Sequence, residues 1–207
     1  MIKCPVRTHR PIFFPFPSKY KAASGISGAA LVFYKRPLAE PVGRKAESTG
    51  KKVSFLPLFQ VVPILLTPET LPLHQTSLRH LCDLLEGSET RLYVVGGAGS
   101  LYVDEGHTIR LMDTPDFPDA FKPLATEMGK ALDALRTRKT IHWTYLSPAA
   151  DFRADGARSG RYRIGGEELL LNADGQSVIS YADYAAAMVD LIEQGGHDRE
   201  RVSAAAL

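Results

Sequence analysis

Two short apolar segments of the chain each run into a turn of small residues. Arg91-Leu-Tyr-Val-Val95 is followed by Gly96-Gly-Ala-Gly99 and Ser100, and Thr140–Leu146 is followed by Ser147-Pro-Ala-Ala150. If both segments are parallel strands, their turns lie at the sheet edge where open α/β sheets bind ligands. Small side chains there would let a flat ring approach the backbone. The alternative is that the small residues only allow close packing and end the strands.

Other residue types that often do chemistry show no functional spacing. The six histidines are dispersed, without the spacing of a metal site. His142 alternates out of phase with its apolar neighbours, which favours a solvated or hydrogen-bonded position, and Trp143 is expected in the core. Cys4 and Cys82 cannot build a disulfide framework, and Cys82 lies among leucines as a small buried hydrophobe. We therefore expect no metal site, and the cysteine usage fits a reducing cytosol.

The residues that surround these turns alternate between helical and β-type patterns. Apolar positions at helical spacing predict a helix over about 78–85 that stops at Gly87, another from about 119, and a last one that starts with the capping pair Ser180 and Asp183. Besides the two segments above, β-type runs predict strands at 161–164, 168–172 and 177–179. This order predicts an α/β fold with a parallel sheet and a small hairpin excursion on the substrate side.

The beginning of the chain has a different character. Through Pro57 there are eleven Lys and Arg against two acids, a balance of +9, which leaves 14 basic and 21 acidic residues, or −7, for the remainder. Residues 1–52 have no sustained periodicity, so we expect an atypical basic segment, disordered or solvated, before a domain over 53–207. Docking of this segment on an acidic partner is a weaker hypothesis, and nucleic-acid binding is not expected without a recognised motif. No apolar run reaches the length of a membrane helix, and we expect a cytoplasmic protein.

Several segments occur in the order found in one known family. They are Arg91–Leu101, Asp113-Thr-Pro-Asp-Phe-Pro118, Trp143–Ala150 and Ile179-Ser-Tyr-Ala-Asp-Tyr-Ala185, supported by Gly160–Gly166 and Asp174-Gly-Gln-Ser177. From about residue 69 onward this series resembles the atypical short-chain dehydrogenase/reductases, often called NAD(P)H-binding proteins or NADH-flavin reductases. The resemblance implies a Rossmann-like fold and NAD or NADP as cofactor. It further implies that the first turn runs beside the ribose and nicotinamide, and that the second forms a wall against the nicotinamide ring.

The chain departs from that family in two places. Members open with a strand, a glycine-rich phosphate turn and a helix, which bind the pyrophosphate. Here only Gly25-Ile-Ser-Gly28-Ala-Ala-Leu31 is similar, its third glycine is Leu31, and the residues before it are too polar for a buried strand, so we interpret it as an incidental stretch. The missing elements would be central strands: either the N-terminal segment replaces them or the fold is incomplete. The Tyr and Lys pair of short-chain reductases also has no match in the helix after 119.

The leading hypothesis is an NAD(P)H-dependent oxidoreductase that transfers hydride to a small planar acceptor, such as a flavin or a quinone. Its cofactor-binding residues would be Gly96, Gly97, Ala98, Gly99, Ser147, Pro148 and Ala149, with Ser100 as the catalytic residue. The alternative is a non-catalytic remnant of the family that has lost its cofactor site. The sequence leaves open the acceptor, the choice between NAD and NADP, and the oligomeric state.

Overall fold

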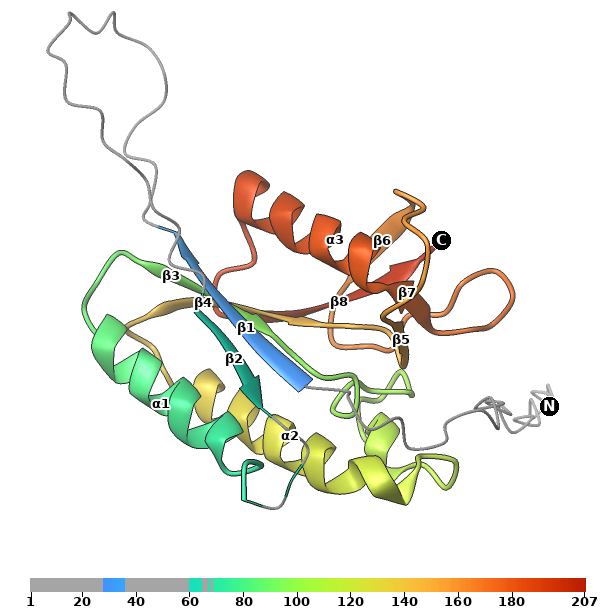
Figure 1. The fold of residues 1–207 in the computed structure, drawn as a ribbon, viewed down its shortest axis with the longest axis horizontal. Coiled ribbons are helices and arrows are strands. Elements are labelled where there is room, and N and C mark those ends of the chain that lie inside the picture. Colours follow the sequence, from blue (N-terminus) through green and yellow to red (C-terminus); the bar gives the residue numbers. More distant parts are fainter. Residues whose placement is uncertain (1–27, 36–59, 65–66, 68) are drawn as a thin grey trace, which may run out of the picture.

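A computed structural model describes residues 28–35, 60–64, 67 and 69–207 (Figure 1). Its six-stranded sheet has the strand order β2-β1-β3-β4-β8-β6, and two further strands, β5 and β7, pair separately. The strands are β1 (Gly28–Lys35), β2 (Gln60–Ile64), β3 (Arg91–Val95), β4 (His142–Ser147), β5 (Asp151–Arg153), β6 (Tyr162–Gly165), β7 (Val178–Ser180) and β8 (Glu200–Ala206). The helices are α1 (Leu73–Leu85), α2 (Lys122–Arg136) and α3 (Tyr181–Gln194), with short 3₁₀ turns η1 (Leu111–Asp113) and η2 (Asp119–Phe121).

Strands β3 and β4 lie side by side and run parallel. Their register pairs Leu92 with Trp143 and Val95 with Leu146, so both strands end at the same edge of the sheet. Each connection between parallel strands needs a crossover, which α2 supplies between β3 and β4 and α3 supplies before β8. The two turns of small residues therefore follow neighbouring strands at one sheet edge, as the sequence predicted.

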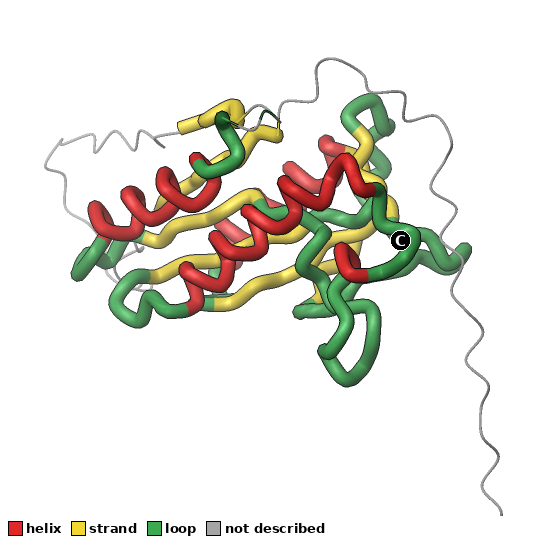
Figure 2. The backbone as a smooth tube through the Cα atoms, turned by 90° about the horizontal axis from the view of Figure 1, so that it is seen from below, coloured by secondary structure: helices red, strands yellow, loops and turns green. Residues whose placement is uncertain are grey.

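Helices cover both faces of the sheet. Figures 1 and 2 show α1 and α2 on one face and α3 on the other. The α1/α2 side buries Leu92, Val94 and Trp143, whereas the α3 side buries Tyr93 and Leu146, which is the alternation of side chains expected of strands. Trp143 is 2% exposed and Cys82 is 1% exposed, so both are core residues, as expected.

The helix ends follow the predicted signals. Helix α1 starts earlier than predicted, at Leu73, and the chain leaves it through Gly87, whose φ of 68° favours glycine. Helix α2 carries its proline in the first turn. In α3, the Ser180 hydroxyl accepts a hydrogen bond from the Asp183 N–H, so the predicted capping pair begins this helix.

Strands β1 and β2 extend the sheet beyond β3. Strand β1 runs antiparallel to β3, with Val32 opposite Val94, and β2 is antiparallel to β1. Hence the apolar run before residue 66 joins the same sheet through β1, which itself comes from the segment 1–52. The part of 25–31 that the structure describes, Gly28–Leu31, is strand and not a turn that opens a helix. Residues 25–27 lie outside the described part of the chain. Apart from β1, so does the segment 1–52 for which we expected disorder.

The C-terminal part of the sheet differs from the prediction. Strand β6 pairs with β8 and not with a strand at 168–172, so the predicted hairpin is wrong. In that stretch only isolated pairing occurs, with the Leu169 N–H donating to the Tyr102 carbonyl. Strands β5 and β8 were not predicted, although β8 lies inside the sheet between β4 and β6. The fold is α/β and Rossmann-like, and its described residues lack the glycine-rich βαβ unit with which such folds open.

Candidate active site

A cavity of about 210 Å³ opens at the carboxyl ends of β3 and β4. Its walls come from the two predicted turns, from the loop before α2, from α2, from β5 and from the start of α3. The lining residues are Gly97, Ala98, Gly99, Leu111, Phe117, Pro118, Phe121, Leu124, Ala125, Met128, Pro148, Ala149, Ala150, Phe152 and Tyr181. We call this space the turn cavity. Ligand pockets for drug-sized molecules measure roughly 300–1,000 Å³, so the turn cavity is smaller than such pockets.

The structure separates the predicted site residues into two groups. Gly97, Ala98, Gly99, Pro148 and Ala149 line the turn cavity. The remaining three, Gly96, Ser100 and Ser147, are buried and do not line it. The first group is thus brought together around one space, while the second lies behind it. What role each residue has in binding or catalysis stays a prediction.

Gly96 is required by the ring of Tyr145. A Cβ atom on residue 96 would lie 2.0 Å from Cε1 of that ring, far inside van der Waals contact. The backbone is also fixed there, because the Gly96 N–H donates to the Leu146 carbonyl at 2.7 Å. Position 96 of the first turn therefore needs glycine because the Tyr145 ring packs there. Close packing was one of the two explanations that the sequence left open for the small residues of this turn.

Two buried tyrosines hold the turns in place. The Tyr145 hydroxyl accepts a hydrogen bond from the Gly97 N–H at 3.3 Å, and the Tyr184 hydroxyl donates to the Leu146 carbonyl at 2.6 Å. Burial raises the pKa of Tyr145 to about 12 and raises the pKa of Tyr184 well above its usual value. Both phenols are therefore neutral at physiological pH, and they serve as fixed hydrogen-bonding groups under the turns.

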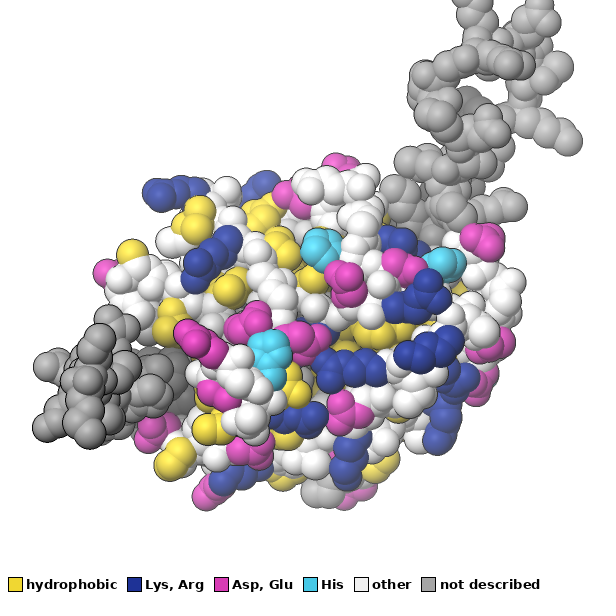
Figure 3. Space-filling model, turned by 180° about the vertical axis from the view of Figure 1, so that it is seen from behind, with side chains coloured by type: hydrophobic (Ala, Val, Ile, Leu, Met, Phe, Trp, Pro, Cys, Tyr) yellow, Lys and Arg dark blue, Asp and Glu magenta, His cyan; other side chains and the backbone are white. Residues whose placement is uncertain are grey.

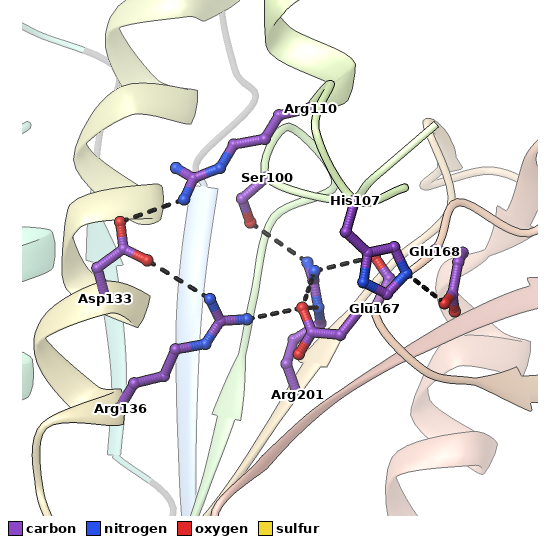
Figure 4. Close-up of polar contacts among 8 residues, drawn as sticks. All are labelled: Ser100, His107, Arg110, Asp133, Arg136, Glu167, Glu168 and Arg201. Carbon is purple, nitrogen blue, oxygen red and sulfur yellow. Dashed lines mark hydrogen bonds and ion pairs between the residues drawn. The ribbon is translucent and has the colours of Figure 1, made fainter. Parts of the chain in front are cut away.

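Ser100 does not line the turn cavity and lies beside a charged network that includes Asp133 and Arg136 of α2 (Figure 4). The Ser100 hydroxyl accepts a hydrogen bond from Arg201 at 3.5 Å, and Ser100 is 6% exposed. Arg201 has a fully buried side chain that pairs with Glu167, and Glu167 also pairs with Arg136 at 2.6 Å. Burial lowers the pKa of Arg201, and the adjacent Glu167 carboxylate opposes that effect. In this geometry Ser100 supports the loop after the first turn.

Ser147 is fully buried at the end of β4. Its hydroxyl has no hydrogen-bond partner among the described residues, and neither has that of Ser203, which is its register partner on β8. The second turn thus presents Pro148 and Ala149 to the turn cavity and keeps the Ser147 hydroxyl behind it.

Sequence reasoning missed the aromatic side chains of the site. Phe117, Phe121, Phe152 and Tyr181 line the turn cavity together with the small residues. The Phe152 and Tyr181 rings pack with centroids 4.1 Å apart and an angle of 42° between their planes. A signal for two of them was present, because Phe117 and Tyr181 lie inside the segments that carry the family resemblance. Their position in separate elements concealed that they meet.

The described residues offer few other sites. They contain no group of three or more His, Cys, Asp or Glu side chains that could hold a metal ion. His142 pairs with Asp198 at 2.9 Å, which confirms the expected hydrogen-bonded position. On the face seen in Figure 3, Lys and Arg are interspersed with Asp and Glu. Among the described helices, none is long and apolar enough to cross a membrane.

Similar proteins were found by sequence and by structure, although no family model matches the chain. The Bacillus subtilis (strain 168) protein YwnB, described as uncharacterized, is 49% identical over 130 residues, which are 62% of this chain and 61% of YwnB. The chain thus spans about three fifths of that curated relative. A crystal structure of a "putative NADH-flavin reductase" from Streptococcus pneumoniae is 52% identical, with a TM-score of 0.67, over 68% of this chain and 67% of that chain.

Two further solved structures show the same likeness. One is a "putative exported protein" from Burkholderia pseudomallei, 37% identical with a TM-score of 0.58 over 67% of this chain and 68% of that chain. The other is a "putative epimerase" from Bacteroides thetaiotaomicron, 34% identical with a TM-score of 0.54 over 64% of this chain and 74% of that chain. Because one relative is described as exported, the cytoplasmic location stays a prediction.

The mostly parallel sheet, with helices on both faces and a cavity at the strand ends, defines a Rossmann-like α/β protein. Within that class, the identity of 52% over two thirds of a solved relative shows the family. Over its C-terminal two thirds, the chain belongs to the atypical short-chain dehydrogenase/reductases that include NADH-flavin reductases. This confirms the resemblance that the sequence motifs carried.

Proposed function

We propose that the protein is an NAD(P)H-dependent oxidoreductase that transfers hydride to a small planar acceptor, such as a flavin or a quinone. The observation that carries the proposal is the turn cavity, which lies between two turns at the carboxyl ends of neighbouring parallel strands. In open α/β sheets this is the place where ligands bind. When bound, a reduced nicotinamide supplies a hydride, that is, a proton with two electrons.

The residues around the turn cavity fit the nicotinamide end of such a cofactor. Gly97 and Gly99 let α2 pack closely on the first turn, because a Cβ on either residue would lie within 3 Å of Met128 or Ala125. Ala98 of the first turn and Pro148 and Ala149 of the second turn contribute small apolar surfaces to the cavity. The apolar lining excludes water from the ring, which protects a hydride donor from side reactions. The phenols of Tyr145 and Tyr184 keep both turns in place without offering a charge.

The pyrophosphate end has no such counterpart among the described residues. Strand β1 lies beside β3 in antiparallel direction, and in the described part of the chain no glycine turn leads from a strand next to β3 into a helix on that side of the sheet. This observation favours a second candidate function: a non-catalytic member of the family that retains the turn cavity but no longer binds the phosphates of the cofactor. The two candidates differ in whether a reduced dinucleotide binds with saturation.

Calorimetric titration of the full chain with NADPH, NADH and reduced nicotinamide mononucleotide separates the two candidates. The reductase proposal predicts saturable binding of at least one dinucleotide and a higher unfolding temperature in its presence, since a ligand of the native state adds stability. No saturable binding up to millimolar concentration would refute it and support the non-catalytic candidate. Equal affinity for the mononucleotide and the dinucleotide would show that only the ring end is recognised.

A variant that narrows the turn cavity controls for binding elsewhere. Ala98 lines the cavity and is partly exposed, so Ala98→Leu fills space without disturbing the core. Ala185 is exposed on α3 and does not line the cavity, so Ala185→Leu adds the same atoms at a neutral place. We expect the first variant to lose at least tenfold in dinucleotide affinity, equivalent to about 1.4 kcal/mol, and the second to bind like the native chain.

We further propose that the partners are small molecules, with no membrane or nucleic acid involved. The mixture of basic and acidic side chains on the face in Figure 3 supports this, because nucleic-acid binding needs a concentrated basic surface.

A further inference from the structure

The turn cavity contains one polar side chain. Of its lining residues, Tyr181 alone carries a side-chain hydroxyl, and none is Asp, Glu, Lys, Arg or His. An apolar ligand pocket usually fixes the orientation of its ligand through a few polar groups. Among the described residues that line the cavity, Tyr181 is therefore the one whose side chain carries a hydrogen-bond donor.

Tyr181 is held in place by its backbone and by its ring. It is the first residue of α3, whose start is fixed by the cap between Ser180 and Asp183. Its ring packs on Phe152, which in turn packs on the buried Tyr184 with centroids 4.8 Å apart. The residue is 39% exposed, and its hydroxyl makes no hydrogen bond to the described residues. An anchored ring with an unpaired donor at a cavity wall is preorganised for a ligand.

Further aromatic rings come from the other side of the cavity. Phe117 and Phe121 belong to the loop and the 3₁₀ turn before α2, so the cavity has aromatic side chains on both walls. Aromatic rings attract other flat rings through stacked and tilted contacts. The absence of a charged group among the lining residues disfavours a charged occupant, whose desolvation would remain uncompensated.

We propose that Tyr181 is the acceptor-binding residue of the site. Its ring stacks, together with Phe152, on an uncharged planar acceptor, and its hydroxyl donates a hydrogen bond to a conjugated carbonyl oxygen of that acceptor. Isoalloxazine and quinone rings share this chemistry. The inference rests on the proposed function and specifies the side of the site that receives the hydride.

Binding of the acceptor alone tests the inference without any measurement of activity. Calorimetry on the full chain uses riboflavin and menadione as probes. The variants are Tyr181→Phe, which removes only the hydroxyl, and Tyr181→Ala, which removes the ring as well. Tyr162→Phe is the matched control, because the Tyr162 hydroxyl pairs with Asp190 and that residue does not line the cavity.

We expect Tyr181→Phe to weaken binding of the preferred probe between about two- and tenfold, the effect of one neutral hydrogen bond. Tyr181→Ala should weaken it by a further factor of at least about three, and Tyr162→Phe should leave it unchanged. Binding of riboflavin alone identifies a flavin acceptor, and binding of menadione alone identifies a quinone. Failure of the native chain to bind either probe, or equal affinity in native and Tyr181→Phe chains, overturns the inference.

NADPH titration of the same variants distinguishes this inference from the proposed function. Tyr181→Phe should bind NADPH like the native chain, because the two turns hold the nicotinamide. If no chain binds NADPH while the probes bind as expected, the reductase proposal fails and the acceptor site stands. If NADPH binds and Tyr181→Phe has no effect on the probes, the acceptor inference fails and the reductase proposal stands.

Discussion

Alanine at position 96 is expected to destabilise the whole domain. The added Cβ would meet three ring atoms of Tyr145, at 2.0, 2.6 and 2.6 Å, so the ring or the turn must move. The ring is 1% exposed in the α1/α2 core, and overpacking of such a core costs about 1–3 kcal/mol. If the turn moves instead, the 2.7 Å hydrogen bond from the Gly96 N–H to Leu146 is lost, at about 1 kcal/mol. We therefore expect a loss of about 1–3 kcal/mol, whichever of the two moves.

Urea unfolding measures this loss as a lower transition midpoint at an unchanged slope. Gly129→Ala is the control, because a Cβ there would have no neighbour closer than 3.8 Å and the residue lies inside α2. Alanine is the better helix former by about 1 kcal/mol, so the control should be as stable as the native chain or more stable.

Removal of the ring should rescue the variant. In a Tyr145→Leu background the Gly96→Ala change should cost much less, with a coupling energy of about 1–3 kcal/mol between the two positions. A Gly96→Ala chain as stable as the native chain would refute the packing argument, and so would a loss that persists undiminished without the ring.

Three more predictions concern buried polar groups. Glu167→Ala leaves the buried Arg201 side chain without its carboxylate partner and should lower the free energy of unfolding in urea by about 3 kcal/mol. Asp133→Asn changes a half-exposed carboxylate and should lower it by less than about 1 kcal/mol. Equal losses in the two variants would contradict this. Burial lowers the pKa of His74, although the nearby Glu127 carboxylate opposes this effect. Below about pH 6.5 the unfolded state therefore binds more protons than the folded state. The free energy of unfolding should fall from pH 7.5 to pH 5.5, and it should fall less steeply in the His74→Gln variant. Burial raises the pKa of Cys82 to about 11, so mapped alkylation by iodoacetamide at pH 8 should modify it only in the unfolded chain.

The parts of the fold that the sequence predicted are those with strong local patterns. Strand β3 contains the apolar and aromatic run Leu92–Val95, β4 carries Trp143, Tyr145 and Leu146, and α3 has a capping pair and a helical stripe. Strand β8 was missed because Arg201-Val-Ser-Ala-Ala-Ala206 is poor in β-branched and aromatic residues. Its strand conformation results from pairing on both sides, with β4 and β6, and no local signal encodes that. Residues 168–172 have a β-type sequence pattern, but β6 pairs with β8 and not with them.

The site was predictable to a similar extent. Its two turns follow strands that the sequence identifies, and parallel pairing brings them together. The burial of Ser100 depends on Arg201, which belongs to the unpredicted β8, so its environment could not be foreseen. Phe152 and Tyr181 meet because β5 pairs with β7 directly before α3, a contact between segments far apart in the sequence.

The most direct test of the central claim is to locate a bound dinucleotide by the amide NMR signals of the ¹⁵N-labelled chain. Titration with NADPH should shift the signals of Gly97 and Ala149 with one common saturation curve. The signals of His142 and Asp198, at the opposite edge of the sheet, should stay unchanged. Saturable binding that leaves Gly97 and Ala149 unshifted, or that shifts only the opposite edge, would contradict a nicotinamide site between the two turns.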